Sequence, residues 1–257
     1  MNTSWISPSQ FPALSENEIQ IWRIKTDEIS FDWKLCEFFL SDDEKEKVRR
    51  FAFEKDRSVY AVSHCLLRLI LSEILWRNHR KIIFVKNEYG KPSVLNLYFE
   101  PLVKFNLSHS NYGVLIGIMV NHQIGVDLEF HRSGFNILEV ADHFFSKIEI
   151  DSLKALPEHL QETGFYNCWT RKEAYIKAKG EGLSIPLNRF SVTLNPIIKP
   201  RLIEVINKPD EPNNWVLKTF NPWADYTAAV CYEGEFSNFS YFDSEEYLCN
   251  KIHKNTL

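Results

Sequence analysis

The chain has 257 residues, of which 44% are hydrophobic and 25% are charged, and its formal net charge is −4 at pH 7. This composition is ordinary for a globular protein with one large domain or two modest ones. The acidic balance gives no support to general nucleic-acid binding, so we expect no nucleic-acid partner. The first residues lack a basic start before an apolar run, and the longest apolar stretch, 113–120, is too short to span a bilayer. We therefore expect no secretory signal and no membrane partner.

The five cysteines are widely scattered and include no Cys-x-x-Cys pair. An odd number of cysteines without close spacing argues against both a disulfide framework and a zinc ribbon. We therefore expect a reducing, cytoplasmic environment.

The first half of the chain predicts a strand, two helices and three further strands. The segment 41–44, Ser-Asp-Asp-Glu, indicates a capped helix with an acidic first turn. Apolar residues recur at helical spacing over 55–78, which predicts a long helix with a buried face. The expected strands lie at 19–24, 82–85, 103–107 and 114–120.

The second half repeats this order of elements without repeating the sequence. It begins with an expected strand at 123–129, continues with helices within 136–156 and reaches a long helix that ends near Lys179. The expected later strands lie near 189–194, 201–206, 214–220 and 226–232. A strand, a long helix and several strands therefore occur twice.

Two carboxylates share one face of the predicted strand at 123–129. Apolar residues alternate there with Gly125, Asp127 and Glu129, so Asp127 and Glu129 point the same way. Carboxylates are hard oxygen ligands, and no His or Cys at ligand spacing lies beside them, which favours Mg²⁺ or Mn²⁺ over zinc. The alternative is an ordinary polar face on a solvent-exposed strand.

The long helix of the second half carries a matching stripe. Trp169, Glu173 and Lys177 are four residues apart and therefore stack along one side of a helix. Gly180 and Gly182 end this helix after a basic last turn. The alternative for Glu173 and Lys177 is an ordinary stabilising helix pair.

These two segments and several others resemble the Sfp-type 4′-phosphopantetheinyl transferases. Residues 125–129, Gly-Val-Asp-Leu-Glu, are similar to the family signature G-(I/V)-D-(I/L/V)-E. Residues 169–183 are similar to the signature W-(S/T)-x-K-E-(S/A)-x-x-K-x-x-G-x-G-L. Further similar segments, in the same order as in the family, are 88–92, 105–110 and 144–149, and more weakly 47–57 and 186–192. The resemblance covers most of the chain, although the last fifty residues or so add little to it.

The resemblance implies an α+β fold of two pseudo-duplicated α/β halves. Each half is a long helix packed on a small, mainly antiparallel sheet, and the active site lies between the halves, here 1–121 and 122–257. It implies an enzyme that transfers the 4′-phosphopantetheine group of coenzyme A to a serine of an apo acyl or peptidyl carrier protein and releases adenosine 3′,5′-bisphosphate. The implied partners are coenzyme A and the carrier, and the implied cofactor is Mg²⁺, with Mn²⁺ as an alternative. The length favours a monomer, because shorter relatives need several subunits to complete their site.

The resemblance also implies roles for residues of the C-terminal half. Asp127, Glu129 and Glu173 would hold the metal ion, and Lys177 would reach the phosphate oxygens. Glu173 and Lys177 are therefore also catalytic candidates. Glu149 matches an acid that in the family is a candidate to accept the serine proton. As the last residue of a Ser-x-x-Glu segment it also fits a capping box, and both roles are compatible.

The implied nucleotide contacts lie mainly in the N-terminal half. Ser108 and His109 resemble the pair that contacts the 3′-phosphate of coenzyme A, and Lys91 resembles the lysine that holds the nucleotide. Lys47 and Arg57 are either additional phosphate contacts or ordinary surface charges.

One departure from the family pattern concerns this anchoring. Glu44 stands where some relatives have a further lysine, which puts part of the basic anchoring of the 3′-phosphate in question.

Two other functions fit part of the pattern. Another metal-dependent phosphotransferase or nucleotide hydrolase would use the three carboxylates, but it leaves the Ser-His and Tyr-Gly-Lys-Pro segments without a task and lacks a glycine-rich phosphate loop. A non-catalytic module that binds coenzyme A or a carrier would most simply have lost one of the carboxylates, and all three are present. The carrier, from fatty-acid, polyketide or nonribosomal peptide synthesis, is not identified by the sequence, and Phe and Tyr residues within 135–166 are the candidates to contact it.

Overall fold

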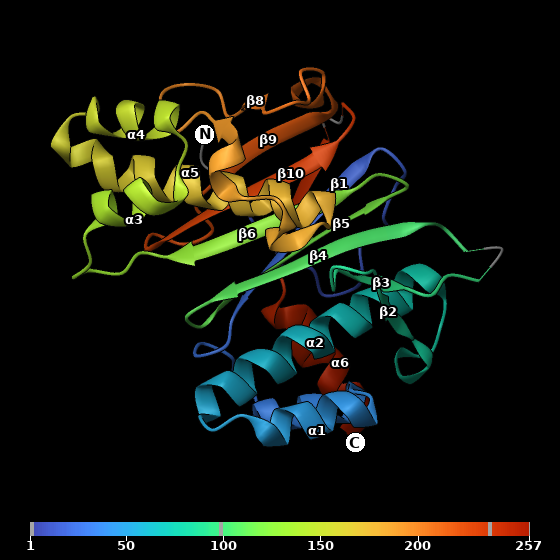
Figure 1. Ribbon diagram of the computed structural model, residues 1–257. Helices are drawn as coiled ribbons and strands as arrows, with labels where there is room; N and C mark the ends of the chain where they lie inside the picture. Colours follow the sequence, from blue (N-terminus) through green and yellow to red (C-terminus); the bar gives the residue numbers. More distant parts are fainter. Residues whose placement is uncertain (1–2, 98–99, 236–237, 257) are drawn as a thin grey trace. The chain divides into compact units, whose positions relative to one another are not determined.

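The protein is described by a computed structural model that covers residues 3–97, 100–235 and 238–256, and its chain divides into two compact units (Figure 1). Unit 1 consists of Met1–Val85, Pro92–Asn121 and Phe236–Leu257, and unit 2 consists of Lys86–Lys91 and His122–Glu235. The expected division after residue 121 therefore differs from this one at two segments. Lys86–Lys91 lies in unit 2 and not in the N-terminal half, and Phe236–Leu257 lies in unit 1 and not in the C-terminal half.

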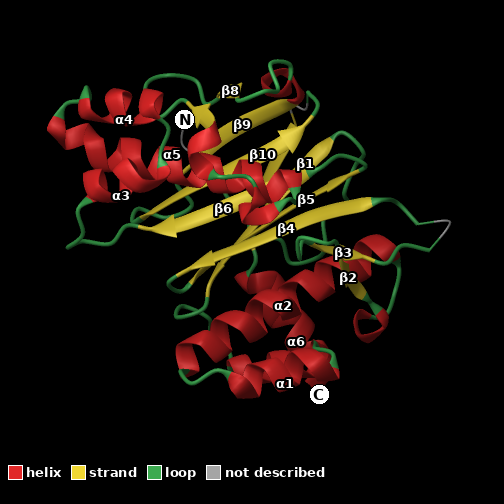
Figure 2. Cartoon of the chain, viewed as in Figure 1, coloured by secondary structure: helices red, strands yellow, loops and turns green. Residues whose placement is uncertain are grey.

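Unit 1 is built on a four-stranded sheet with the strand order β11-β1-β5-β4, of which Figure 2 labels β1, β5 and β4. Strand β5 is antiparallel to both of its neighbours, whereas β1 and β11 are parallel. The elements of this unit are β1 (Glu18–Lys25), η1 (Trp33–Phe39), α1 (Asp42–Arg50), α2 (Glu54–Leu75), η2 (His79–Lys81), β2 (Phe84–Lys86), β3 (Pro92–Val94), β4 (Val103–Ser110), β5 (Gly113–Val120), β11 (Asn238–Asp243) and α6 (Glu245–Thr256). The last residue of β2, Lys86, already belongs to unit 2.

Helix α2 is the core helix of unit 1. Its apolar residues pack with those of η1, β1, β4, β5 and α6 in one hydrophobic cluster. The helix is long and apolar enough to cross a membrane, but 72% of its most apolar window is buried inside the protein, as a core helix requires. It ends three residues earlier than the predicted 55–78, because Trp76 adopts a left-handed conformation with φ of 51°.

Unit 2 is built on a three-stranded antiparallel sheet with the strand order β6-β10-β9. Helix α5 packs on this sheet, and its apolar residues share a second hydrophobic cluster with side chains of α3, α4, β7, β9 and β10. The elements of this unit are β6 (Ile124–Phe130), α3 (Ile137–Phe144), α4 (Lys147–Lys154), α5 (Glu158–Lys179), η3 (Gly182–Ser184), η4 (Leu187–Arg189), β7 (Phe190–Val192), β8 (Leu202–Val205), η5 (Glu211–Asn214), β9 (Trp215–Phe220) and β10 (Tyr226–Glu233).

The predicted α+β class is confirmed, because each unit packs one long helix on a small and mainly antiparallel sheet. The C-terminal elements β11 and α6 were not predicted. Strand β11 belongs to unit 1 because it pairs with β1 in register, from Glu18 with Asn238 to Arg23 with Asp243. All five cysteines are free thiols in this structure.

Candidate active site

Strand β6 and helix α5 approach each other backbone to backbone at Gly125. A Cβ atom on Gly125 would lie 2.2 Å from the carbonyl oxygen of Ala174 and 2.3 Å from the amide nitrogen of Ala178. Real Cβ atoms do not come this close to backbone atoms, so glycine is required at this position. Since the two helix residues that face it are alanines one turn apart, the strand and the helix can pack in direct contact.

This contact brings Asp127 of β6 to Lys177 of α5. Asp127 is two residues beyond Gly125, so it lies on the same face of the strand and points toward the helix. The ammonium of Lys177 donates to Asp127 Oδ1 at 2.6 Å. The Asp127 side chain is 5% exposed and that of Lys177 is 28% exposed, so the pair lies at the edge of the protein interior.

Glu173 lies one helical turn before Lys177 and completes this group. Burial raises the pKa of the Glu173 carboxyl, the charge of Asp127 raises it further, and Lys177 offsets only part of the effect. The two carboxylates are therefore close enough to repel each other. The structure brings together three residues that the sequence assigns to one site, and they carry two negative charges and one positive charge when ionised.

The carboxylates do not form a closed metal site. Within the described ranges, no three His, Cys, Asp or Glu side chains converge in a way that could hold an ion. Asp127, Glu129 and Glu173 supply oxygen donors of the kind that Mg²⁺ and Mn²⁺ prefer, but the ammonium of Lys177 takes one oxygen of Asp127. The donor chemistry thus fits a hard divalent cation, whereas the three ligands are not gathered around one point.

Glu129 lies at the rim of a cavity of about 380 Å³ in unit 2. The cavity is lined mainly by aromatic and apolar side chains between the end of β6 and helices α3 and α5. They include Phe130, Phe135, Val140, Phe165, Tyr166 and Trp169, together with Arg132. Trp169 begins the helix stripe that continues through Glu173 and Lys177, so this cavity and the carboxylate group share one side of α5.

Glu149, predicted as a proton acceptor, lies in the interior of unit 2. The ammonium of Lys172 donates to both of its carboxylate oxygens at 2.7 Å. The backbone amides of Val192 and Ser146 donate to the same carboxylate at 2.7 and 2.8 Å. The Glu149 side chain is 0% exposed, and the capping box with Ser146 is formed. This geometry favours the structural alternative over a role as a base.

The sequence analysis missed that Arg171 and Lys172 belong to the fold. Lys172 also donates to the carbonyl oxygen of Phe190 at 2.6 Å, and its side chain is 1% exposed. Arg171 Nε donates to Thr219 Oγ1 at 2.8 Å, and burial lowers the pKa of Arg171 to about 10. Successive helix residues are turned by 100°, so these two cations point away from the side of α5 that carries Glu173. This turn is the signal that could have separated them from Lys177.

Lys91 connects its own turn to β6 and α5. Its ammonium donates to the carbonyl oxygens of Ala178 at 2.9 Å and Ile124 at 3.2 Å. The Ala178 carbonyl belongs to the last turn of α5, where such groups have no partner within the helix. Asn87 from the same turn donates to the carbonyl oxygen of Gly180 at 2.7 Å. These contacts explain why the segment 86–91 belongs to unit 2, and they give Lys91 a structural role.

Ser108 and His109 lie near the end of β4 in unit 1. Neighbouring strand residues point to opposite faces, and here Ser108 is buried whereas His109 is exposed. His109 shares its face with Phe105, which packs into the cluster around α2. The structure therefore does not bring the two side chains together on one face of the strand.

Of the other two predicted nucleotide contacts, Lys47 lies in α1 and Arg57 lies near the start of α2. The ammonium of Lys47 is exposed and lies 4.7 Å from the centre of the Tyr60 ring. Arg57 Nε donates to the carbonyl oxygen of Phe51 at 2.8 Å, and the residue lines a cavity of about 370 Å³. Lys47 is thus exposed on unit 1, whereas Arg57 is partly buried in the lining of this cavity.

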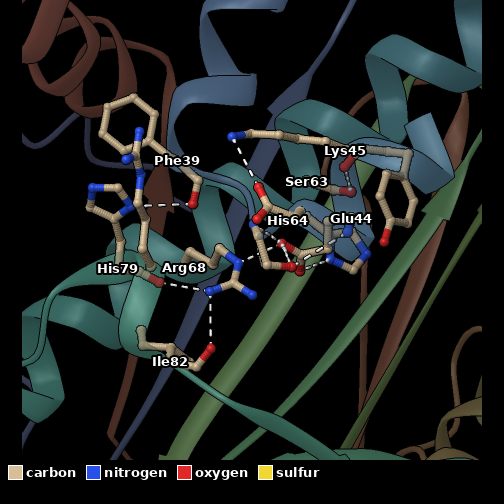
Figure 3. A network of polar contacts seen from close by, with 12 residues as sticks. Phe39, Glu44, Lys45, Ser63, His64, Arg68, His79 and Ile82 are labelled. Carbon is tan, nitrogen blue, oxygen red and sulfur yellow. Dashed lines mark hydrogen bonds and ion pairs between the residues drawn. The ribbon is translucent and has the colours of Figure 1, made fainter. Parts of the chain in front are cut away.

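Glu44, the residue that departs from the expected family pattern, forms a buried polar network (Figure 3). Arg68 Nε donates to Glu44 Oε2 at 2.6 Å, and His64 Nδ1 lies 3.1 Å from Oε1. Burial alone would raise the pKa of Glu44, but the hydrogen bonds with His64, Arg68 and the amide of Ser41 outweigh it and lower the pKa to about 2. Glu44 therefore fixes α1 to α2 and is not positioned as a phosphate contact.

The chain is similar in sequence to proteins of one known family. Residues 123–231 match the model of the 4′-phosphopantetheinyl transferase superfamily, and residues 22–119 match the model of the 4′-phosphopantetheinyl transferase N-terminal region. The chain is 35% identical to the 4′-phosphopantetheinyl transferase Sfp of Bacillus subtilis, over 75% of this chain and 82% of the relative. It is 31% identical to the 4′-phosphopantetheinyl transferase HetI of a Nostoc strain, over 75% of this chain and 81% of that relative.

Proposed function

The chain belongs to the 4′-phosphopantetheinyl transferase superfamily, and we propose that Asp127, Glu173 and Lys177 carry out the transfer in this protein. The substrate is coenzyme A, and the acceptor is a serine of an apo carrier protein. The observation that carries the assignment is the group at the contact of β6 and α5. Two carboxylates share one ammonium there, and the pKa of Glu173 is raised by burial and by Asp127.

The reaction is a displacement at phosphorus. The serine oxygen forms a bond to the phosphorus that is next to pantetheine, and the bond from that phosphorus to the bridging oxygen of the pyrophosphate breaks. The proton of the serine hydroxyl goes to a base, and adenosine 3′,5′-bisphosphate leaves. In such a transfer the protein mainly positions the reactants and stabilises charge on the phosphate oxygens. The ammonium of Lys177 is suited to the second task as a point charge.

Neither Glu173 nor Glu149 is well suited to accept the serine proton. Burial and the charge of Asp127 raise the pKa of Glu173 in the metal-free site, but a bound divalent cation lowers the basicity of a carboxylate that holds it. Four hydrogen bonds already occupy the carboxylate of Glu149 in the protein interior. We therefore assign Glu173 to the metal ion and not to the proton transfer.

The oxygen donors of the site fit a magnesium ion. Asp127, Glu129 and Glu173 would hold it, and it would neutralise negative charge on the pyrophosphate. Binding of the ion would compete with the ammonium of Lys177 for Asp127. Lys177 would then be released toward the phosphate oxygens.

His109 is the best candidate in unit 1 for the 3′-phosphate of coenzyme A. It is exposed, and Lys47 and Arg57 are further cations on the same unit. The 3′-phosphate is unchanged by the reaction, so a residue that contacts it contributes equally to substrate and transition state. His109→Ala should therefore raise KM for coenzyme A with a smaller effect on kcat, and should matter little with 3′-dephospho-coenzyme A. An equal loss with both donors would contradict this role.

The carrier is expected to contact the aromatic cavity beside Glu129. The cavity shares one side of α5 with Glu173, and its lining includes the exposed Phe135. We further propose that the enzyme is a monomer. We also propose that it is cytoplasmic, which agrees with its five free cysteines.

The function is tested by one incubation. The protein, coenzyme A, MgCl₂ and an apo carrier protein are mixed, and the mass of the carrier is measured. Transfer adds the phosphopantetheine mass to the carrier and produces adenosine 3′,5′-bisphosphate. Adenosine 3′,5′-bisphosphate together with free 4′-phosphopantetheine, without modification of the carrier, would indicate a hydrolase. Binding without either product would indicate a non-catalytic module. A parallel incubation with EDTA in place of MgCl₂ tests the metal.

A further inference from the structure

One surface of unit 1 is both apolar and basic, and we call it the Trp76 surface. Its apolar side chains come from the residue after α2, from β2 and its approach, and from the loop after β3. They are Trp76, which is 95% exposed, and Ile83, Val85, Leu95, Leu97 and Leu102, which are between 40% and 55% exposed. This is an unusual number of exposed large apolar residues in one small region.

Hydrogen bonds hold these segments side by side. Arg77 Nη1 donates to the carbonyl oxygen of Leu95 at 3.1 Å, and the Leu95 amide donates to the carbonyl oxygen of Ile83 at 2.9 Å. The loop after β3 is closed by a hydrogen bond of 2.7 Å from Asn96 Nδ2 to the carbonyl oxygen of Pro101. Figures 1 and 2 show β2 and β3 next to the end of α2. The exposed side chains therefore form one region.

The hairpin of β2 and β3 carries large apolar side chains on both of its faces, although Ser93 lies on the outer face and Lys86 on the inner one. Phe84 and Val94 point into unit 1, and the Phe84 ring lies 5.7 Å from that of Phe105. Ile83 and Val85 point to the opposite face, because strand side chains alternate. A hairpin with one solvent-facing side normally carries polar residues there. Large apolar side chains on the outer face indicate that something covers it.

Trp76 is not explained by the packing of the chain. It has φ of 51°, a left-handed conformation that favours Gly or Asn and is rare for other residues. An indole that is 95% exposed gains almost no burial in return. The tryptophan is thus presented to the surroundings at the end of a rigid core helix.

The Trp76 surface is also positively charged. The sequence has no acidic residue between Glu73 and Glu88, whereas Lys81 and Arg80 are exposed in this interval, and Arg80 donates to the carbonyl oxygen of Phe38. The acid of the neighbouring loop, Glu100, is ion-paired with Arg77, and its side chain is only 3% exposed. The whole chain has a net charge of −4, so the positive charge is a local property of this surface.

We propose that the Trp76 surface binds the anionic surface of a lipid bilayer. Tryptophan and aliphatic side chains enter the boundary between head groups and acyl chains, and lysines and arginines beside them contact lipid phosphates. A protein partner is less well matched, because the centres of protein interfaces favour anchors that fill pockets and are poor in lysine. The proposal concerns where the enzyme works and departs from the expectation of no membrane partner, which considered only segments that span a bilayer.

Sedimentation with lipid vesicles tests the proposal on the full chain. Vesicles of phosphatidylcholine alone are compared with vesicles that also contain phosphatidylglycerol. We expect binding only to the anionic vesicles, and weaker binding at high salt. The double variant Trp76→Ser, Ile83→Ser and the variant Lys81→Glu should each bind roughly tenfold more weakly. Ile197→Ser is the matched control, because Ile197 is an 85% exposed aliphatic residue in unit 2 and should bind like the wild type.

Three outcomes would overturn the proposal. The first is no sedimentation with anionic vesicles, and the second is equal sedimentation of the wild type and the double variant. In the third, the wild type does not bind vesicles but binds an acidic apo carrier protein, and the double variant loses this binding. That result would assign the surface to a protein partner. Transfer to a soluble carrier should be unchanged in all variants. Absence of transfer in the wild type would contradict the proposed function and not the lipid surface.

Discussion

Two groups of carboxylates and lysines lie along helix α5, and they are built in opposite ways. Glu149 and Lys172 are 0% and 1% exposed, and each is surrounded by hydrogen-bond partners. Asp127, Glu173 and Lys177 lie at the edge of the interior, where Lys177 is 28% exposed. One group has one acid for one base, and the other has two acids for one base. The first group fixes the helix, whereas the second keeps a charge imbalance that a ligand can relieve.

This difference shows how residues of one motif separate into two roles. Lys172 and Glu173 are neighbours in the sequence, but their side chains are turned by 100° around the helix axis. Lys172 points to the capping box of α4, whereas Glu173 points to the strand that carries Asp127. Groups with perturbed pKa values at an accessible edge are candidates for chemistry, and fully paired groups inside are candidates for stability.

The largest expected effect is the loss of stability when the buried ion pair of Glu149 and Lys172, here called the closed pair, is broken. Glu149→Gln leaves the charge of Lys172 buried without its counterion, so the free energy of unfolding should fall by about 3–5 kcal/mol. The folded fraction should keep its kcat for transfer at low temperature. Urea unfolding and carrier modification measure the two quantities. Asp151→Asn on the same helix is the control, because its pair with Lys147 is exposed and should contribute little. A stable but inactive Glu149→Gln would restore Glu149 as the base.

The group of Asp127, Glu173 and Lys177, here called the open group, should respond in the opposite way, with a loss of activity and not of stability. Asp127→Ala and Glu173→Ala should each lower the rate of transfer by roughly a hundredfold or more, the scale expected when a preorganised electrostatic contact is removed. The fold should survive, because neither side chain belongs to a hydrophobic cluster. The rate is measured by the mass of the carrier over time, and circular dichroism checks the fold. Near-normal turnover of either variant would show that the site is assigned wrongly.

The contact that assembles the open group can itself be disturbed. Gly125→Ala would force β6 away from the backbone of α5, so we expect a loss of about 1–3 kcal/mol in the free energy of unfolding. Transfer should also slow, because Asp127 and Lys177 would separate. The control is Gly164→Ala on the same helix, whose Cβ would meet Leu156 Cδ1 at 2.5 Å, the movable end of a side chain. Equal costs for the two variants would argue against a special role of the strand contact.

Local patterns were sufficient to predict much of this site. Alternation along β6 predicted that Asp127 and Glu129 share a face, and spacing along α5 predicted the stripe of Glu173 and Lys177. Family resemblance connected the two segments, because no local pattern states which strand faces which helix. The strand contact was also visible in principle as a glycine opposite small helix residues, but only the structure gives the distances that make glycine necessary.

The remaining features depend on contacts between residues distant in the sequence. Strand β11 pairs with β1 although more than 200 positions separate them, and local propensity does not identify such a partner. Lys91 was predicted to contact the nucleotide, and Lys172 was given no role although it lies inside the motif of α5. Each is held instead by oxygen acceptors of unit 2 that the sequence does not place beside them. The capping box of α4 was predicted, but the ion pair that closes it was not.

The smallest expected effect is a gain of stability at Glu173, which contrasts with the loss at Glu149. Burial, and after it the charge of Asp127, raise the pKa of Glu173 above its ordinary value of 4.5 in the folded chain. The folded chain therefore holds this proton more tightly than the unfolded chain. The resulting stabilisation is fully present below the unfolded-state pKa and is lost as the pH rises through the folded-state pKa. At pH 7 the ionised carboxylate of Glu173 is less favourable in the folded chain than in the unfolded chain, so its charge lowers the free energy of unfolding.

Glu173→Gln removes this unfavourable charge and keeps the shape of the side chain. The variant should have a higher free energy of unfolding than the wild type at pH 7, and this advantage should shrink as the pH falls below the folded-state pKa. Asp127→Asn should lower the pKa of Glu173, because it removes the second cause of the shift. Urea unfolding at several pH values in the presence of EDTA measures the first effect, and carboxyl NMR titration measures the second. A Glu173→Gln variant that is less stable at pH 7 would mean that the attraction of Lys177 outweighs burial and Asp127, and that the open group is as well balanced as the closed pair.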